Sequence, residues 1–205
     1  MKTVAIVDYG MGNVDSVARA VQECGAKAVV TADRDELESA DSLILPGVGA
    51  FKDGMKHLRD RGLPDLLREQ AINKRIPFLG ICLGMQLMAK RGIESGDTEG
   101  LGWLDAVVVR LKSKGPDERI PHIGWNEVHP SRPSPLFTDI PNGKDFYFVH
   151  SYHLACKDKP AVLADTPYCG GFISAVAKDN LFGVQFHPEK SQKPGFQLLK
   201  NFLSL

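Results

Sequence analysis

Hydrophobic and polar positions along the first hundred residues switch back and forth between the spacing of strands and the spacing of helices. Four short runs of β-branched, aliphatic or aromatic residues predict buried strands at Lys2–Asp8, Ala28–Thr31, Ser42–Leu45 and Pro77–Gly80. Apolar residues at helical spacing predict helices at Val14–Cys24, Phe51–Asp60, Leu63–Asn73 and Leu83–Ala89. Because strands and helices follow one another in turn, the pattern predicts βαβ units and a parallel sheet covered on both faces.

After Gly102 the alternation stops, and strand-like runs separated by turn residues take its place. These runs predict strands at Trp103–Leu111, Gly124–Val128, Phe146–His150, Ala161–Asp165, Phe172–Ala177 and Leu181–Gln185. An amphipathic helix is predicted at Phe196–Leu203. No repeat or linker divides the chain, so residues 1–205 are predicted to form one α/β domain. Its fold class is a mostly parallel central sheet between helices, with a strand-rich second half.

The composition is that of an ordinary globular protein, with 43% hydrophobic and 24% charged residues among 205. Lys and Arg together number 25, as do Asp and Glu, so no overall charge draws the chain to nucleic acid or to an anionic membrane. No apolar run is long enough to span a bilayer, and Asp8 interrupts the first run too early for a secretory signal. The four cysteines form no Cys-x-x-Cys pair, which favours a cytoplasmic protein with reduced thiols.

Neither a metal site nor a bound cofactor is predicted. His150 and His153 lie three residues apart, so on one strand they would point to opposite faces, and no Cys or carboxylate cluster completes a site. Gly10-Met11-Gly12 follows the first strand, but Val14-Asp15 stands where a dinucleotide-binding motif has its third glycine. That segment is interpreted as a tight turn.

The strongest local signal for chemistry is Gly80-Ile81-Cys82-Leu83-Gly84, between a predicted strand and a predicted helix. It matches the Gly-x-nucleophile-x-Gly elbow with cysteine in place of serine. Glycines two residues either side are needed because the turn is sharp, and the helix N-terminus favours the thiolate. The N–H of Leu83 would then face a developing oxyanion. The pentapeptide alone does not exclude the alternative, a small buried thiol packed between glycines.

A cysteine nucleophile needs a base, and His187 is the best placed of six histidines. It ends an apolar strand in Val184-Gln185-Phe186-His187-Pro188-Glu189. Residues two apart in an extended segment face the same side, so Glu189 is expected to orient the imidazole of His187. The order Cys, His, Glu fits the nucleophile–base–carboxylate triad, although any single histidine is more often a structural residue.

A second oxyanion donor is expected in Pro46-Gly47-Val48-Gly49, which follows the third predicted strand. In a parallel sheet this loop lies at the same carboxyl edge as Cys82. Glycines on both sides of Val48 would let its N–H turn inward. The loop alone fits an ordinary strand-to-helix connection equally well.

Taken together, Gly80-Ile81-Cys82-Leu83-Gly84-Met85-Gln86 and Phe186-His187-Pro188-Glu189 resemble the motifs of the class I (triad) glutamine amidotransferases. Within that family the chain resembles the glutaminase subunits of imidazole glycerol phosphate synthases, which belong to histidine biosynthesis. The segments that carry this closer resemblance are residues 8–13, 46–51, 121–126 and 147–152. It covers essentially the whole chain and implies a flavodoxin-like, three-layer fold.

The resemblance implies a role for each matching position. Cys82 attacks the amide carbon of glutamine, His187 moves the proton, and Glu189 orients His187. The oxyanion hole is formed by Val48 and Leu83. The positions that match those holding glutamine are Gly49, Gln86, Glu94, Ser151 and Tyr152. The positions that match the partner interface are Asn13, Trp125, Tyr147 and Lys190.

The resemblance also implies a partner, a (β/α)8-barrel cyclase subunit that forms a heterodimer with the glutaminase and receives its ammonia through an internal channel. Many other amidotransferases carry Pro-Gly-Gly where this chain has Pro46-Gly47-Val48-Gly49. Since Val48 is bulkier than glycine, we hypothesise that its N–H rests turned away from the site. Docking of the partner with its nucleotide would then turn it inward.

Three functions remain to be weighed. The first is a subunit that hydrolyses glutamine and supplies ammonia to this cyclase or, as a variant, to another amidotransferase. The second is a stand-alone γ-glutamyl thiol hydrolase, which activity on γ-glutamyl peptides would favour. The third is a regulatory module without turnover, which the presence of Cys82, His187 and Glu189 together disfavours.

Overall fold

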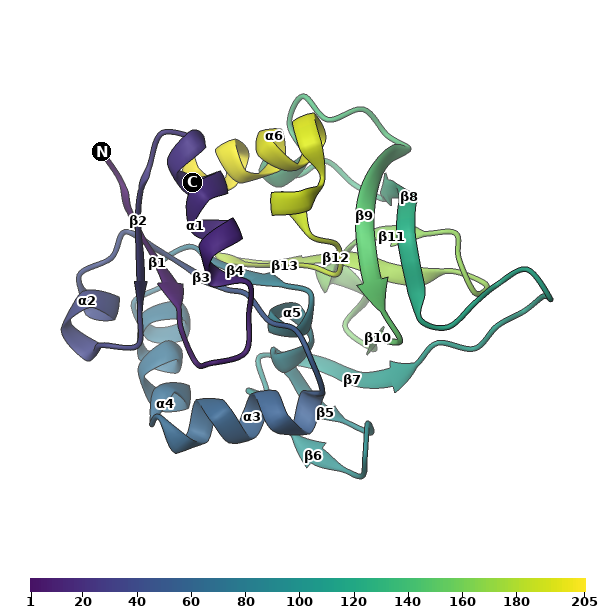
Figure 1. Ribbon diagram of the computed structural model, residues 1–205, viewed down its shortest axis with the longest axis horizontal. Helices are drawn as coiled ribbons and strands as arrows, with labels where there is room; N and C mark the ends of the chain where they lie inside the picture. The colour runs from purple at the N-terminus through teal and green to yellow at the C-terminus, as the bar shows by residue number, and fades with distance from the viewer.

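A computed structural model describes residues 1–205, built around a nine-stranded sheet in the order β2-β1-β3-β4-β13-β12-β11-β8-β9 (Figure 1). Its strands are β1 (Thr3–Val7), β2 (Lys27–Thr31), β3 (Ser42–Leu45), β4 (Phe78–Ile81), β8 (His122–Pro130), β9 (Lys144–His150), β11 (Val162–Thr166), β12 (Phe172–Lys178) and β13 (Leu181–Val184). From β2 to β13 in this order all pairs are parallel, whereas from β13 to β9 all are antiparallel.

A smaller sheet has the order β10-β7-β5-β6. Its strands are β5 (Ala89–Gly92), β6 (Thr98–Glu99), β7 (Leu104–Arg110) and β10 (Tyr152–Cys156). Because β10 follows β9 after the single residue Ser151, the chain passes from the large sheet to the small one at that point. This transition brings the end of β9 close to the carboxyl edge of the parallel strands.

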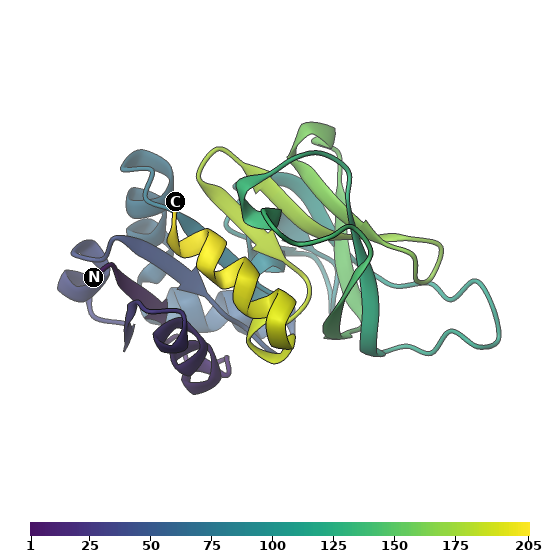
Figure 2. The ribbon, with the colours of Figure 1, turned by 90° about the horizontal axis from the view of Figure 1, so that it is seen from above.

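The helices lie on both faces of the parallel half of the large sheet. Figure 1 shows α1 (Val14–Glu23) and α6 (Gln192–Leu203) on one face, and α3 (Phe51–Asp60) and α4 (Leu63–Arg68) on the other. Figure 2 shows from above that α6 crosses this half, while the antiparallel strands extend to one side. The remaining helical segments are α2 (Arg34–Glu38), α5 (Leu83–Leu87), a π-helical turn η1 (Glu69–Asn73) and the 3₁₀ turns η2 (Pro135–Phe137), η3 (Lys159–Ala161) and η4 (Pro188–Lys190).

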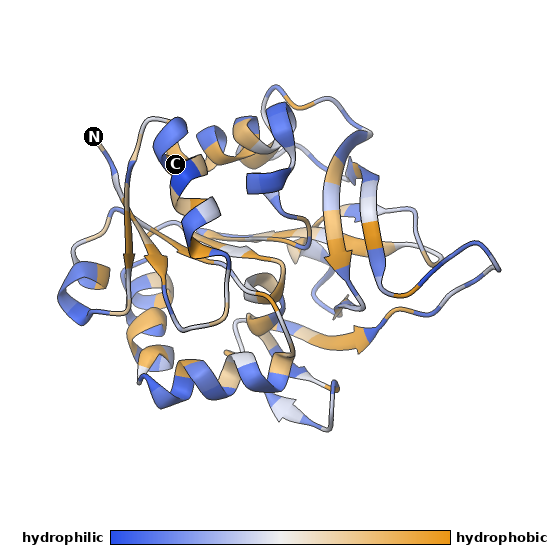
Figure 3. Cartoon of the chain, in the orientation of Figure 1, coloured by the Kyte–Doolittle hydropathy of each residue, from blue (hydrophilic) through white to orange (hydrophobic).

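Each face of the sheet has its own hydrophobic core, and alternation along the strands supplies both. In β1, Val4 and Ile6 pack with α1 and α6, whereas Ala5 and Val7 pack with α3 and α4. A parallel strand covered on both faces needs apolar residues at every position, and the central strands are accordingly hydrophobic throughout (Figure 3). The predicted fold class, a three-layer α/β structure with a strand-rich second half, is confirmed. The parallel and antiparallel strands form one continuous sheet.

Apart from the three short 3₁₀ turns, four elements were not predicted: α2, β5, β6 and β10. The predicted helix Leu83–Ala89 is wrong at its end, because α5 stops at Leu87 and Ala89 begins β5. Strand β5 has two exposed central residues and α2 spans only five residues, so neither carries a hydrophobic period long enough to recognise. The predicted helix Leu63–Asn73 corresponds to α4 continued by the π-helical turn.

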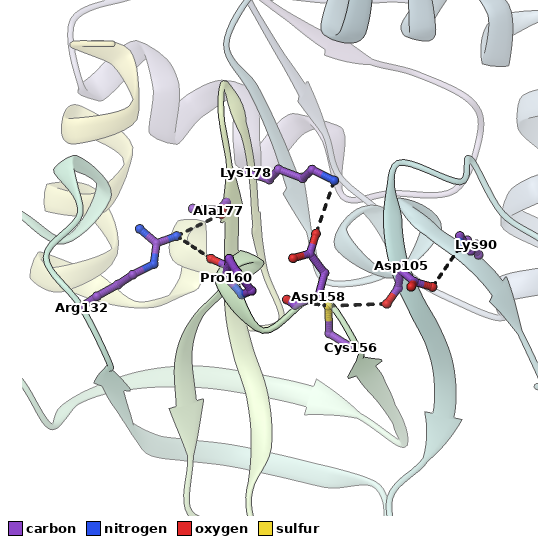
Figure 4. A network of polar contacts seen from close by, with 8 residues as sticks. All are labelled: Lys90, Asp105, Arg132, Cys156, Asp158, Pro160, Ala177 and Lys178. Carbon is purple, nitrogen blue, oxygen red and sulfur yellow. Dashed lines mark hydrogen bonds and ion pairs between the residues drawn. The ribbon is translucent and has the colours of Figure 1, made fainter.

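Polar contacts tie the segment after β10 to both sheets (Figure 4). Asp158 pairs with Lys178 of β12 at 3.3 Å, and the Cys156 thiol donates to the carbonyl of Asp105 in β7. Arg132 donates to the carbonyls of Pro160 and Ala177. Exposed pairs of this kind add little stability each. None of the helices has the length and apolar character that a membrane crossing requires.

Candidate active site

Cys82 lies on a sharp turn between β4 and α5, with φ +53° and ψ −110°, a conformation that L residues rarely adopt. Its backbone N–H donates to the carbonyl of Val184 at 2.7 Å, which fastens the turn to β13. A Cβ at Gly84 would overlap the carbonyl oxygen of Leu45. At Gly80 it would lie 2.7 Å from backbone atoms of α5. Both glycines are therefore required by the close approach of the short helix to the sheet.

His187 and Glu189 form a buried pair, with 2.8 Å between His187 Nδ1 and Glu189 Oε1. The Nε2 atom on the other side of the ring is buried without a hydrogen-bond partner. The reasoning from extended backbone was wrong, because Glu189 lies in the 3₁₀ turn η4. The turn places the Glu189 carboxylate against Nδ1 of the His187 ring.

The environment of His187 favours its protonated form. Burial alone would lower the pKa of the imidazole, but the nearby Cys82 sulfur and the hydrogen bond to Glu189 outweigh burial and raise the pKa to about 10. Cys82 is the other group whose proximity raises the pKa of His187, although no well-formed hydrogen bond joins its sulfur to Nε2. An imidazolium beside the sulfur is the product of proton transfer from the thiol to the histidine. This is the arrangement expected of a nucleophile and its base.

A cavity of about 260 Å³ opens beside Cys82. Its lining includes Val48, Leu83, Val149 and His150, together with all five residues expected to hold glutamine: Gly49, Gln86, Glu94, Ser151 and Tyr152. One oxygen of Glu94 accepts the N–H of Phe51, the first residue of α3, at 2.9 Å. The structure thus brings together at one cavity positions that are up to about a hundred residues apart in the sequence.

Both predicted oxyanion donors are occupied in this structure. The N–H of Val48 donates to the carbonyl of Met11, and the N–H of Leu83 donates to the carbonyl of Gly47, each at 3.3 Å. The carbonyl of Gly47 and the N–H of Val48 belong to the same peptide unit. Rotation of this single peptide would release Leu83 and redirect Val48 at the same time.

A chain of hydrogen bonds runs from β8 to the cavity. Asn126 Nδ2 lies 3.3 Å from His122 Nε2, His122 Nδ1 lies 3.2 Å from His150 Nε2, and His150 Nδ1 lies 2.9 Å from the carbonyl of Tyr152. Since the carbonyl can only accept, His150 carries its proton on Nδ1, and His122 in turn donates from its own Nδ1. Burial lowers the pKa of His122 to about 4 and that of His150 to about 3, so both are neutral.

The expectation that His150 and His153 share a strand was wrong, because β9 ends at His150 and His153 belongs to β10. His153 Nδ1 lies 3.0 Å from the carbonyl of Leu154. No group of three or more His, Cys, Asp or Glu side chains is arranged to hold a metal ion.

The two neutral histidines predict a loss of stability in acid. Their folded-state pKa values lie below the ordinary 6.5, so the unfolded chain binds more protons. Their contribution is complete above pH 6.5, declines as pH falls below that value, and is fully lost once pH has fallen through about 4 for His122 and about 3 for His150. We expect His150→Phe to flatten the fall in unfolding free energy between pH 6 and 4.5 by up to about 1.4 kcal/mol per pH unit.

This prediction is checked by urea unfolding at several pH values, comparing slopes rather than absolute stabilities. His129→Gln is the control, because His129 lies on the surface beside Glu127 and should leave the slope unchanged. A variant at His150 with the slope of the unsubstituted chain would contradict the assignment.

The residues expected at the partner interface gather mainly around one aromatic pair. Trp125 is 46% exposed and meets Tyr147 edge to face, with 6.0 Å between ring centroids. Lys190 Nζ lies 5.9 Å from the centre of the Tyr147 ring. Asn13 is exposed at the start of α1, which contacts the turn η4 that contains Lys190. The neighbouring Ile123 is 61% exposed and adds an unpartnered apolar side chain.

Gln185 was given no role from the sequence, although its side-chain amide contacts the sulfur of Cys82. Gln185 is fully buried, and its Nε2 lies 3.6 Å from Cys82 Sγ. The available signal was a polar residue between Val184 and Phe186, in a segment that is otherwise apolar. The other three cysteines, Cys24, Cys156 and Cys169, are free thiols whose pKa is raised by burial.

Comparison with known proteins identifies the class to which this fold and site belong. Residues 5–205 match the family model described as "Glutamine amidotransferase class-I", and the chain belongs to that family. Among solved structures, "Crystal structure of glutamine amidotransferase" aligns with a TM-score of 0.77 at 21% identity, covering 98% of this chain and 97% of that one. "Structure of PurLQS from Thermotoga maritima" aligns with a TM-score of 0.77 at 20% identity, covering 100% and 99%. These two likenesses show the fold.

More similar relatives narrow the comparison to one kind of subunit. The chain is 47% identical over 202 residues to "Imidazole glycerol phosphate synthase subunit HisH 2" of Pseudomonas aeruginosa, covering 98% of this chain and 99% of the relative. It is 45% identical over 202 residues to "Imidazole glycerol phosphate synthase subunit HisH 1" of Campylobacter jejuni, covering 98% and 100%. The similarity therefore extends along nearly the whole of both chains.

Proposed function

We propose that this protein hydrolyses glutamine to glutamate and ammonia, and passes the ammonia to a cyclase subunit. The cyclase makes imidazole glycerol phosphate and aminoimidazole carboxamide ribonucleotide in histidine biosynthesis. The observation that carries the proposal is the position of Cys82 beside His187 and Glu189, at a cavity lined by the expected glutamine-binding residues. Near-full-length identity of 45–47% to subunits of imidazole glycerol phosphate synthase supports it.

The reaction uses a covalent intermediate. His187 takes the thiol proton of Cys82, and the resulting thiolate attacks the side-chain amide carbon of glutamine. The carbon–nitrogen bond then breaks, and His187 returns the proton to the leaving ammonia, which leaves a thioester on the sulfur. Water, deprotonated by the same histidine, hydrolyses the thioester to glutamate and restores the thiol. Glu189 keeps Nδ1 protonated throughout, so that Nε2 faces the sulfur.

Glutamine is held by Gly49, Gln86, Glu94, Ser151 and Tyr152. Glu94 places a carboxylate in the cavity, where it complements the α-ammonium group of the substrate. Gln86 already donates its amide hydrogens to the carbonyl of Tyr152 and to Gln185 Oε1, so its own Oε1 is the atom left to accept from glutamine.

The partner is a (β/α)8-barrel cyclase subunit, and the pair forms a cytoplasmic heterodimer in which residues 1–205 act as one glutaminase domain. Trp125 and Tyr147, with Lys190 and Asn13 nearby, present an exposed aromatic and cationic surface suited to such an interface. Ammonia would pass into the barrel through an internal channel without entering solvent.

Docking of the partner switches the site on by turning the peptide between Gly47 and Val48. In its resting orientation this peptide occupies both oxyanion donors, which supports the hypothesis based on the bulk of Val48. The loss of one oxyanion donor slows catalysis by about 10²–10³-fold in other enzymes. Glutamine is therefore spared while the cyclase holds no acceptor nucleotide.

We expect the isolated chain to hydrolyse glutamine at least about 100-fold more slowly than the complex with the cyclase and its nucleotide substrate. Glutamate formation measures the rate in both cases, with the cyclase alone as the blank. Equal rates would refute control by the loop, while no glutamate from the loaded complex would refute the glutaminase assignment. Hydrolysis of γ-glutamyl peptides without any partner would favour a stand-alone hydrolase.

A further inference from the structure

Two consecutive residues, Val184 at the end of β13 and Gln185 just after it, contact the backbone and the side chain of Cys82. The carbonyl of Val184 accepts the backbone N–H of Cys82 at 2.7 Å, and the side-chain amide of Gln185 lies 3.6 Å from Cys82 Sγ. Gln185 is fully buried, and its own N–H donates to the carbonyl of Ser174 in the neighbouring strand. A buried glutamine in an apolar strand costs free energy unless both ends of its amide are paired.

The orientation of this amide follows from its neighbours. The backbone carbonyl of Tyr152 can only accept, so Gln86 must present its NH₂ group there, at 2.9 Å. The same NH₂ group lies 2.9 Å from the Gln185 side chain, which must then present its oxygen. The NH₂ group of Gln185 is thereby directed at the sulfur. This series of hydrogen bonds starts from a backbone carbonyl, which can only accept. The carbonyl therefore fixes which end of each side-chain amide, oxygen or NH₂, faces its neighbour.

We propose that Gln185 is a positioning residue for the reaction, whose amide donates to Cys82 Sγ, holds its rotamer and stabilises the thiolate over the thiol. This deepens the proposed function, on which it rests. The thiol can also donate weakly to the carbonyl of Val149 at 3.9 Å, and that contact is lost when the proton leaves. The donation from Gln185 strengthens at the same moment, because hydrogen bonds to a charged acceptor are about twice as strong as neutral ones.

The test is the pH dependence of Cys82 alkylation by iodoacetamide, followed by mass spectrometry of the peptide that contains Cys82. Methionine has nearly the shape of glutamine and no donor, so Gln185→Met should slow alkylation at pH 7 about tenfold and displace the rise of rate to higher pH. Gln185→Glu keeps the acceptor towards Gln86 and replaces the donor at the sulfur with an acceptor. It should slow alkylation further.

Gln70→Met is the matched control, since Gln70 is also buried but its amide makes no hydrogen bond to another residue and lies outside the cavity. It should alkylate like the unsubstituted chain. A folded Gln185 variant, verified by its thermal unfolding, that keeps the original pH profile would overturn the proposal. Because alkylation requires neither glutamine nor the cyclase, this failure is distinguishable from failure of the glutaminase assignment.

Discussion

In the complex with the cyclase subunit, we expect Cys82→Ala to abolish synthesis of imidazole glycerol phosphate from glutamine and to leave synthesis from added ammonium unchanged. The thiol is the only group at the cavity able to form the thioester, so its removal should lower the glutamine-dependent rate by about 10⁴-fold or more. Ammonium bypasses this step, because it reaches the cyclase from solvent. Product formation with each nitrogen source, measured on the same preparation, gives the result directly.

Cys156→Ala is the control for removal of a buried thiol. Cys156 lies in β10 and donates to the carbonyls of Asp105 and Asp158, away from the cavity. Both activities should survive that change. Loss of both in Cys82→Ala would mean that Cys82 serves assembly instead of chemistry, or that the cyclase is not the partner.

Glu189→Gln should lower the glutamine-dependent rate by about 10⁴-fold while the fold is preserved. The carboxylate accepts the Nδ1 proton of His187 at 2.8 Å, so Nε2 is left free to receive the thiol proton. A glutamine side chain can turn its NH₂ group to Nδ1 and favour the tautomer that carries its proton on Nε2, which cannot act as the base. The rate of glutamate formation in the complex measures the loss.

The chain contains a matched control on its surface. Glu127 and His129 are also two residues apart and in contact, at 3.1 Å, but both are largely exposed. Glu127→Gln removes the same carboxylate from the same spacing, and the rate should not change. If Glu189→Gln lowered the rate of glutamate formation no more than Glu127→Gln does, the role assigned to Glu189 would be wrong.

Where an element has a strong period of its own, sequence and structure agree closely. Ser42–Leu45 and Phe51–Asp60 were predicted with the bounds that β3 and α3 have. Strands β5 and β10 were missed because they are stabilised mainly by pairing with another strand, β7, and carry little periodicity of their own. The pairing of β13 with both β4 and β12, which joins the parallel half to the antiparallel half, leaves no mark in local periodicity.

In the site, too, features set by neighbouring residues could be predicted, and features set by distant contacts could not. The elbow around Cys82 could be recognised because steric demands act between neighbours in the chain, and Gly80 and Gly84 record them. The pairing of His187 with Glu189 was predictable from their spacing, although the expected backbone geometry was wrong. Gln185 was overlooked because its partners Cys82 and Gln86 are 103 and 99 residues away, and a lone glutamine carries no such information.

The sequence by itself determined the family resemblance and the glycine-flanked turn that holds Cys82. It also identified His187 and Glu189 as the expected base and carboxylate. These features depend on contacts between residues close together in the sequence, or on motifs formed by continuous segments of the chain. Only the tertiary structure decided that the peptide between Gly47 and Val48 leaves both predicted oxyanion donors bonded elsewhere, and that a buried amide faces the sulfur. Such hydrogen bonds join distant segments, and a buried polar group takes whichever partner packing brings within reach.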